Sequence, residues 1–346
     1  MHPKLELMRG SSTLPDSFSD QSSDTSSPDD TLPQFSLLAA KMDDLAFQRQ
    51  EISHLVTDFL KRSDFRAVQS PRDVELRDKL SVEVNKWGVD INPSMLEKMV
   101  ETSCSYAETA FGHTDFEHRY YIALYTACML YGEDLGEHDP DAVTQFARRL
   151  VRGDKQVSPI FDCLADLLKQ AHLYWSDVGA DAIITGTVDA LTATAIEFAT
   201  TGTPVSPSAL RYPYYLRTRA GGGPQYTHFM FMRSWREKAD SYLQILPEIE
   251  HWTLGTNDIL SFYKEELAGE TSNYVHLRAD AESISPWDVL RHLTEEVLDT
   301  ARRIDDITAN DPELYALWNR YLQCYLEFSV RTPRYRLREL GIGYGL

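Results

Sequence analysis

Apolar residues recur at helical spacing along most of this 346-residue chain. Between residues 312 and 330, for example, Leu314, Leu317, Trp318, Tyr321 and Leu322 follow the i, i+3, i+4, i+7, i+8 pattern. This pattern puts them on one face of an α-helix. No convincing run of alternating β-branched residues interrupts it elsewhere. The sequence therefore predicts an all-α fold, a single-domain bundle of about ten to twelve helices.

The same periodicity and the usual start signals locate the individual helices. Proline is well placed in a first helical turn, so Asn92-Pro93 and Pro140 each mark a start. We expect further helices over residues 35–61, 74–87, 115–131, 159–175, 181–200, 286–304 and 312–330. A short helix from Tyr212 should end before the glycines at 221–223, which cannot continue it. The pattern resumes over residues 226–232 and 242–265, with a bend expected near Pro247.

The first 34 residues differ in composition from the rest. Ser, Asp, Thr and Pro dominate there, as in S-D-Q-S-S-D-T-S-S-P-D-D. Such a segment cannot bury enough apolar surface to offset its ordering entropy. We therefore expect a disordered tail over residues 1–34 and one helical domain over residues 35–346.

Charge and cysteine usage exclude several classes of protein. The net charge of −19 opposes binding to nucleic acid or anionic membranes, which attract basic surfaces. No apolar run reaches the roughly 18 residues that span a bilayer, and no signal peptide is recognisable. The cysteines, which show no C-x-x-C spacing, are interpreted as reduced core residues: Cys104, Cys128, Cys163 and Cys324. The sequence thus predicts a cytoplasmic protein without a nucleic-acid partner and without membrane insertion.

Residues 257–265, N-D-I-L-S-F-Y-K-E, combine a helical period with a set of metal ligands. Asn257, Ser261 and Glu265 are four residues apart and project from one helix face. They offer the hard oxygen ligands that Mg²⁺ prefers. Lys264 adds an ammonium that a metal-bound phosphate could accept as counter-charge. The alternative is a solvated helix face, but apolar neighbours such as Trp252 make the helix too apolar for the surface alone.

A second acidic group follows the apolar helix expected over residues 115–131. Glu133, Asp134 and Glu137 lie in E-D-L-G-E at spacings compatible with one helix end. Acidic residues at a helix C-terminus oppose the helix dipole, so they cost stability unless a cation offsets them. A solvated acidic loop is the alternative interpretation of this segment.

Three segments of the chain resemble the class I terpene cyclases, and most closely their trichodiene synthase branch. These are Y-P-Y-Y-L-R from Tyr212, N-D-x-x-S-x-x-K-E from Asn257, and P-R-Y-R-L-R-E-L from Pro333. The resemblance is nearly continuous from about residue 212 to 340, weaker upstream, and absent before about residue 38. It implies a class I terpenoid synthase bundle around a central cavity.

The resemblance also assigns the acidic group. In this family an Asp-rich D-D-x-x-D motif ends a buried helix across the cavity from the second motif, and E-D-L-G-E occupies that place here. Glu133 replaces the family's first Asp, the principal ligand, and Glu137 replaces its last. Because Glu is one methylene longer than Asp, the metal position or affinity is expected to differ, and an impaired first site stays an alternative.

The roles of the remaining candidates are implied by the resemblance. Arg217 lies where the family keeps an arginine that senses diphosphate, with Arg219 as a near competitor. Arg334 and Tyr335 match an R-Y pair that hydrogen-bonds diphosphate, for which a planar guanidinium is suited. Phe328 lies where the family has a cavity aromatic. Aromatic faces stabilise a carbocation through their quadrupoles, and Tyr125 and Trp252 are further candidates for that role.

Together these features predict a sesquiterpene cyclase that takes farnesyl diphosphate and Mg²⁺, with three ions expected around the diphosphate. A homodimer is a further expectation. The rivals are a cyclase for a shorter or longer prenyl diphosphate, such as geranyl or geranylgeranyl diphosphate, and a non-catalytic helical relic with an impaired first motif. A chain-elongating prenyltransferase is disfavoured because the second motif supplies Asn, Ser and Glu rather than a second Asp-rich set.

Overall fold

The computed structural model describes residues 48–89, 91–236 and 241–343. Regular structure in these ranges is helical, apart from an isolated antiparallel bridge between Trp175 and Met232. The predicted all-α class is therefore confirmed. The expected tail over residues 1–34, its boundary with the helical domain and the start of the first expected helix lie outside the described residues.

The described chain begins in a helix that covers residues 48–62. The α-helices that follow are α2 (Val74–Lys86), α3 (Pro93–Ala110), α4 (Phe116–Leu135), α5 (Pro140–Arg152), α6 (Pro159–Tyr174), α7 (Asp177–Thr200), α8 (Tyr212–Ala220), α9 (Gly223–Phe229), α10 (Leu246–Ala268), α11 (Tyr274–Glu282), α12 (Pro286–Thr308) and α13 (Pro312–Arg331). Short 3₁₀ helices are η1 (Gly136–His138), η3 (Pro333–Tyr335) and η4 (Leu337–Leu340).

Short polar side chains fix where many of these helices begin. The Asp73 carboxylate accepts a hydrogen bond of 3.0 Å from the Leu76 amide, and the Asp115 carboxylate accepts one of 3.0 Å from the His118 amide. Each cap satisfies a backbone N–H that has no partner inside the helix. Prolines occupy several first turns, where their missing N–H is not needed. They are Pro93, Pro140, Pro159, Pro247, Pro286 and Pro312.

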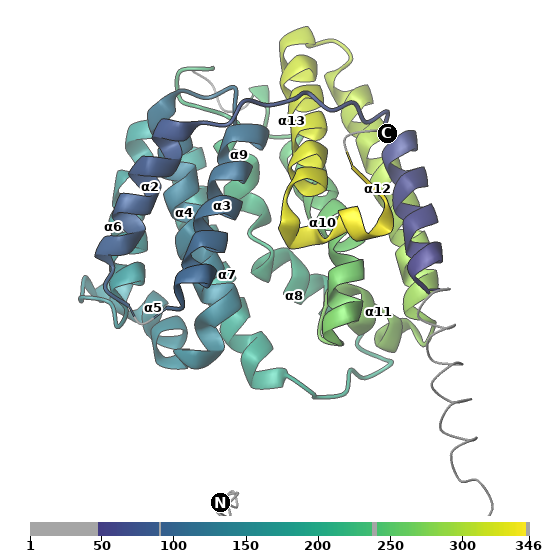
Figure 1. The fold of residues 1–346 in the computed structure, drawn as a ribbon, viewed down its shortest axis with the longest axis horizontal. Helices are drawn as coiled ribbons and strands as arrows, with labels where there is room; N and C mark the ends of the chain where they lie inside the picture. Colours follow the sequence, from purple (N-terminus) through teal and green to yellow (C-terminus); the bar gives the residue numbers. More distant parts are fainter. Residues whose placement is uncertain (1–47, 90, 237–240, 344–346) are drawn as a thin grey trace, which may run out of the picture. The chain divides into compact units, whose positions relative to one another are not determined.

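Helix α10 contacts α8, α9, α11, α12 and η3 (Figure 1). Its close contact with α12 depends on Gly255, because a Cβ there would lie 2.4 Å from Val297 Cγ2. Most of the helix is buried, including Trp252, Ile259 and Phe262. Polar side chains on so buried a helix need partners or a ligand.

Two glycines, Gly221 and Gly222, separate helix α8 from helix α9. Gly222 has φ = 66°, a left-handed conformation that glycine adopts without steric cost. At Gly221 a Cβ would lie 2.4 Å from Leu254 Cδ2 on α10. The absence of a side chain at Gly221 therefore lets the backbone approach α10 closely. Both glycines line the cavity described below.

Aromatic rings fill much of the core. Trp252 meets Trp318 edge to face with ring centroids 5.1 Å apart, and Trp175 lies 5.0 Å from Phe229. Such ring pairs contribute about 0.5–1.5 kcal/mol each beyond the area they bury. The core thus connects α10 to α13 and the end of α6 to α9.

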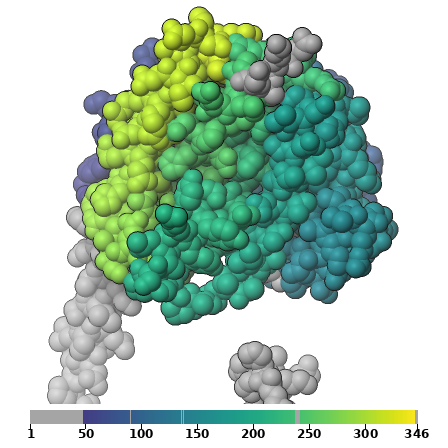
Figure 2. Space-filling view, turned by 180° about the vertical axis from the view of Figure 1, so that it is seen from behind, coloured from purple at the N-terminus to yellow at the C-terminus, as the bar shows by residue number. Residues whose placement is uncertain are grey.

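Helix α7 is, within the described residues, the one helix long and apolar enough by length and composition to cross a membrane. No such run was predicted from the sequence, and α7 carries Asp181 and Asp189 among its apolar residues. In the fold α7 contacts α5, α6, α8 and α9. On the reverse face of the molecule, the teal surface of this region adjoins the green surface of the central helices (Figure 2).

Several boundaries differ from the predicted ones. Helix α10 begins at Leu246, four residues later than predicted, and Pro247 lies in its first turn instead of bending it. Helix α4 continues to Leu135, so Glu133 and Asp134 lie on its last turn rather than after it. Apolar periodicity fixes a helix face but not its ends, because the ends depend on capping and on the neighbouring chain.

All four cysteines are free, which agrees with the predicted absence of disulfides. Three of them are buried, but Cys163 is only half-buried.

Candidate active site

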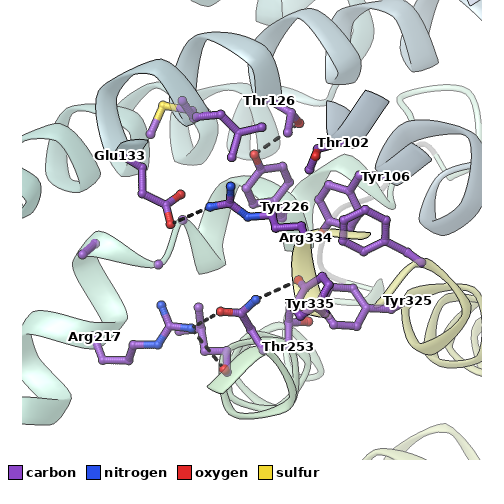
Figure 3. Close-up of a pocket in the computed structure, with 18 of the residues that line it drawn as sticks. Thr102, Tyr106, Thr126, Glu133, Arg217, Tyr226, Thr253, Tyr325, Arg334 and Tyr335 are labelled. Atoms are coloured by element: carbon purple, nitrogen blue, oxygen red, sulfur yellow. Dashed lines mark hydrogen bonds and ion pairs between the residues drawn. The ribbon is translucent and has the colours of Figure 1, made fainter. Parts of the chain in front are cut away.

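A cavity of about 220 Å³ opens between the helices. Side chains from α3, α4, α7, α8, α9, α10, α13 and η3 line it. In Figure 3 the charged Glu133 and Arg217 lie toward one side, and the rings of Tyr106, Tyr226 and Tyr325 toward the other. The cavity therefore combines a charged side with an aromatic one.

The three predicted ligands of the second motif lie on one face of α10. Asn257 and Glu265 line the cavity. Ser261, between them in sequence, is 1% exposed, and its Oγ has no hydrogen-bond partner in the described structure. A buried hydroxyl without a partner costs roughly 1–3 kcal/mol, which a ligand can offset. This amide, hydroxyl and carboxylate set fits a hard cation such as Mg²⁺.

Lys264 also lines the cavity, beside this cluster. Its Nζ lies 3.2 Å from Glu265 Oε1. The predicted ammonium therefore lies next to the predicted carboxylate ligand at the wall of the cavity.

Arg217 is held against α10 by three different groups. Its Nε donates to Asp258 Oδ2 at 3.0 Å, and its Nη2 donates to Asn257 Oδ1 at 3.0 Å and to the Leu254 carbonyl at 3.2 Å. Burial raises the pKa of Asp258 to about 6, although the Arg217 guanidinium favours the carboxylate. Burial opposes the charge of Arg217, yet Asp258 and Glu265 raise its pKa above the ordinary value. At neutral pH the pair is ionic.

Arg334 connects η3 to the last turn of α4. Its Nη1 donates to Asp134 Oδ2 at 2.8 Å, and its Nη2 donates to Asp134 Oδ1 at 3.1 Å and to Glu133 Oε1 at 3.3 Å. The two Asp134 contacts form a bidentate pair, the strong geometry for guanidinium and carboxylate. Arg334 and Glu133 both line the cavity. The predicted acidic motif and the predicted R-Y pair thus meet at this cavity.

Tyr335 and Phe328 complete the wall next to Asn257. Asn257 Nδ2 donates to the Tyr335 hydroxyl at 2.9 Å. The Phe328 ring lies edge to face with Tyr335, with centroids 5.8 Å apart, and 4.7 Å from the Tyr106 ring. Both residues line the cavity, and their predicted roles toward diphosphate and a carbocation stay predictions.

Two other candidates are not at the cavity wall. Trp252 is fully buried against Trp318, and Tyr125 is fully buried with its hydroxyl 2.8 Å from Thr187 Oγ1. Neither lines the cavity, so their predicted role facing a carbocation is wrong in this structure. An aromatic residue on a buried helix is more often core, and sequence alone does not give the direction of its ring.

Two further candidates are Arg219 on α8 and Glu137 in η1. Arg219 pairs with Asp189 and stacks on Tyr215, away from the cavity, so Arg217 rather than Arg219 is the arginine that α8 places at the cavity. The backbone of Glu137 belongs to η1, but its side chain lies outside what the structure describes. Its predicted role as a ligand stays a prediction.

Several residues of the site were not predicted from the sequence. Asp258 anchors Arg217, and its place inside the N-D-x-x-S motif was the available signal. Tyr106 and Tyr226, whose rings lie 5.1 Å apart, come from helices with no motif, so no signal identified them. Glu197 of α7 also lines the cavity, and burial raises its pKa to about 7.

The metal ligands proposed by the sequence come from two separate elements. In the described part of the chain no three His, Cys, Asp or Glu side chains gather as a metal site. The donors instead divide between the Glu133 and Asp134 pair on α4 and the mixed Asn257, Ser261 and Glu265 set on α10. This division places oxygen donors on two helices of the cavity wall, where they could hold hard cations.

Comparisons with known proteins agree with this geometry. The family model for trichodiene synthase matches residues 78–342. Alpha-cuprenene synthase of Coprinopsis cinerea is 28% identical over 294 residues, 84% of this chain and 90% of that protein. Longiborneol synthase of Gibberella zeae is 29% identical over 304 residues, 84% of this chain and 87% of that protein. Monoterpene synthase 25 of Postia placenta is 29% identical over 288 residues, 83% of this chain and 86% of that protein.

Solved structures share the fold at much lower identity. Linalool/nerolidol synthase of Streptomyces clavuligerus has a TM-score of 0.58 at 16% identity, covering 77% of this chain and 94% of that one. The reconstructed ancestral protein SVS_A2 has a TM-score of 0.61 at 13% identity, covering 80% of this chain and 88% of that one. These likenesses concern the fold alone.

The fold and the family match define the class: this is a terpene cyclase, a lyase that acts on prenyl diphosphates, and its family generally uses a divalent metal. Within that class the chain belongs to the trichodiene synthase family.

Proposed function

We propose that the protein catalyses the Mg²⁺-dependent ionisation and cyclisation of farnesyl diphosphate to a sesquiterpene, with release of diphosphate. The observation that carries the proposal is the meeting of both motifs at one cavity, each with an arginine in contact. Arg334 contacts Glu133 and Asp134, and Arg217 contacts Asn257. Carboxylates for cations and guanidiniums for phosphate oxygens are what a metal diphosphate requires.

Glu133, Asp134, Asn257, Ser261 and Glu265 would hold the ions, and three ions are proposed. Bound Mg²⁺ would neutralise the charge that develops on the leaving diphosphate. Glu137 is included among the proposed ligands through its place in the acidic motif.

The chain's own cations have complementary tasks. Arg217, Lys264 and Arg334 would donate to the diphosphate oxygens, and the Tyr335 hydroxyl would add a further hydrogen bond. These contacts orient the allylic C–O bond for heterolysis, in which the electron pair leaves with the diphosphate. Preorganised donors of this kind stabilise developing charge without reorganising.

The aromatic side of the cavity would hold the carbocation that remains. The Tyr106 ring lies 5.1 Å from Tyr226, 4.7 Å from Phe328 and 5.8 Å from Tyr325. Ring faces stabilise a cation through their quadrupoles and do not form bonds to it readily. A final proton transfer from the cation to the released diphosphate would give the olefin.

The proposal extends to two further properties. The protein is proposed to be cytoplasmic; the contacts of α7 with α5, α6, α8 and α9 support this proposal. A homodimer is proposed as its assembly.

A second candidate substrate is geranyl diphosphate, because one relative of similar identity is named a monoterpene synthase. The two differ by one isoprene unit, and the same charged groups would bind either diphosphate. Substrate choice therefore depends on the aromatic side of the cavity.

The deciding experiment measures diphosphate release and volatile products. Purified protein would be incubated separately with geranyl, farnesyl and geranylgeranyl diphosphate, with Mg²⁺ and with EDTA. We expect farnesyl diphosphate to be consumed fastest, EDTA to abolish turnover, and added Mg²⁺ to restore it. Turnover in metal-free buffer would contradict the metal role, and no release from any prenyl diphosphate would support the non-catalytic relic.

A further inference from the structure

A second cavity, of about 650 Å³, adjoins the active-site cavity. Side chains from α3, α4 and the segment around η3 line it. Thr102, Leu130 and Arg334 line both cavities, so their side chains form the partition between the two. Figure 3 shows Thr102 and Arg334 at the wall of the active-site cavity. The volume of the second cavity is in the range of small-molecule sites, roughly 300–1,000 Å³.

Apolar side chains from all three elements meet at the second cavity. Met95, Met99 and Thr102 follow one another at i, i+4 and i+7 on α3, which puts them on one helix face. Leu130 of α4 and Pro333 of η3 face the same space. Met99 and Leu130 are buried and Met95 is half-buried, so apolar surface extends from the partition toward the outside. Methionine side chains are flexible and polarisable, so they adapt to ligands of irregular shape.

The charged side chains of the second cavity balance one another. Among the described residues that line it, three are acidic and three are basic: Glu97, Glu101, Asp134, Lys98, Arg334 and Arg336. Asp134 pairs with Arg334 at 2.8 Å. Arg336 pairs with Glu339 at 2.7 Å. An anion that entered this cavity would lose hydration without finding an excess of cations, which is costly. The lining therefore favours a neutral apolar ligand over a prenyl diphosphate.

We propose that the second cavity binds a neutral terpene and that the product of the reaction leaves the active site through it. The inference rests on the proposed function, in which diphosphate and the ions occupy the charged side of the active-site cavity. The terpene carries no charge, so carboxylates and guanidiniums at that side do not stabilise it. The second cavity offers apolar surface behind a partition that is one side chain thick at Leu130 and Thr102. Burial of apolar surface there stabilises the terpene by about 25 cal/mol per Å².

Met95 is the residue to change, because it lines the second cavity but not the active-site cavity. In Met95→Trp a larger ring would fill the second cavity from its outer side. The matched control is Val82→Trp, which places the same ring at a position of α2 that is 59% exposed and outside both cavities. Circular dichroism would compare the folds. Lys98→Trp, at an exposed position of the same lining, replaces Met95→Trp if that variant does not fold.

The first measurement is equilibrium dialysis of the full chain against tritiated farnesol, a neutral probe with the carbon chain of the proposed substrate. We expect wild type and Val82→Trp to bind a second molecule of farnesol in addition to the one in the active-site cavity. Met95→Trp should bind only the first. The same number of bound molecules in wild type and Met95→Trp would overturn the proposal. Loss of the second molecule in Val82→Trp as well would show that the effect is not local, and would also overturn it.

The second measurement separates formation of the product from its release. In a rapid-quench single turnover with farnesyl diphosphate and Mg²⁺, Met95→Trp should consume substrate at the wild-type rate. Its steady-state kcat should fall about threefold or more, since slow product release limits kcat in many enzymes. Val82→Trp should match wild type in both rates. A wild-type kcat in Met95→Trp, or an equal fall in both rates, would overturn the exit route.

The two measurements distinguish failure of this inference from failure of the proposed function. Turnover of farnesyl diphosphate by a protein with a single farnesol site would refute this inference alone. A second farnesol site that Met95→Trp removes, in a protein that turns over no prenyl diphosphate, would refute the proposed function but not the second site.

Discussion

Arg334 and Asp134, which are 200 positions apart in sequence, form a bidentate ion pair at 2.8 and 3.1 Å. The pair joins the 3₁₀ helix after α13 to the last turn of α4 at the charged side of the cavity. The residues predicted to bind metal and the residue predicted to bind diphosphate are thus in direct contact. Changes at this side of the cavity should affect chemistry more than folding.

Asn257→Ala and Glu265→Gln are expected to lower the rate of diphosphate release by about a hundredfold or more, since such losses are typical when a transition-state electrostatic contact is removed. Circular dichroism should show an unchanged helical fold, because both residues face the cavity. A rate within a few fold of wild type for both variants would remove the second motif from the mechanism.

Glu133→Asp restores the residue usual in the family but shortens the side chain by one methylene. Glu133 Oε1 lies 3.3 Å from Arg334 Nη2, so the shorter carboxylate should withdraw from both this contact and the cavity. We expect reduced turnover and a higher Mg²⁺ requirement, measured by titrating Mg²⁺ at saturating substrate. Higher activity in the variant would show that the cavity is not adapted to Glu.

Phe328→Ala should change the product mixture more than it changes substrate consumption. The ring packs against Tyr106 and Tyr335 at the cavity wall, so its removal alters the contour that folds the prenyl chain. Gas chromatography with mass spectrometry would compare the products. Tyr125→Phe is the control, because that residue is buried away from the cavity and should leave the product profile unchanged.

Tyr335→Phe removes the hydroxyl that accepts from Asn257 Nδ2 while it keeps the ring against Phe328. Without this acceptor the amide is free to turn. We expect a higher Mg²⁺ concentration for half-maximal rate and a nearly unchanged melting temperature. An unchanged metal requirement would mean that Tyr335 does not orient Asn257.

Glu197 should make stability depend on pH. Burial raises its pKa to about 7 in the folded protein, above the ordinary value of 4.5, so its stabilising contribution is complete below about pH 4.5 and is lost as pH rises to about 7. Glu197→Gln mimics the protonated form. The variant should melt with wild type near pH 4 and above it at pH 8. A constant difference at all pH values would show that the Glu197 pKa is not raised.

Local patterns were sufficient for much of the fold. The start of α3 at Pro93 and the starts of α12 and α13 at Pro286 and Pro312 were predicted to the residue, because proline in a first turn is a local signal. The shared face of Asn257 and Glu265 was predicted for the same reason: the helical period depends on neighbours three and four residues away.

Contacts between helices could not be predicted in this way. Tyr335 meets Asn257 across 78 positions, and Arg217 meets Asp258 across 41. The inward direction of Phe328 and the buried position of Trp252 follow from helix rotation and packing, not from composition. By itself the sequence determined which residues share a helix face and which chemistry they offer, since those properties are local. Only the tertiary structure decided which faces meet at the cavity, because that depends on close packing such as Gly255 against Val297 and Gly221 against Leu254.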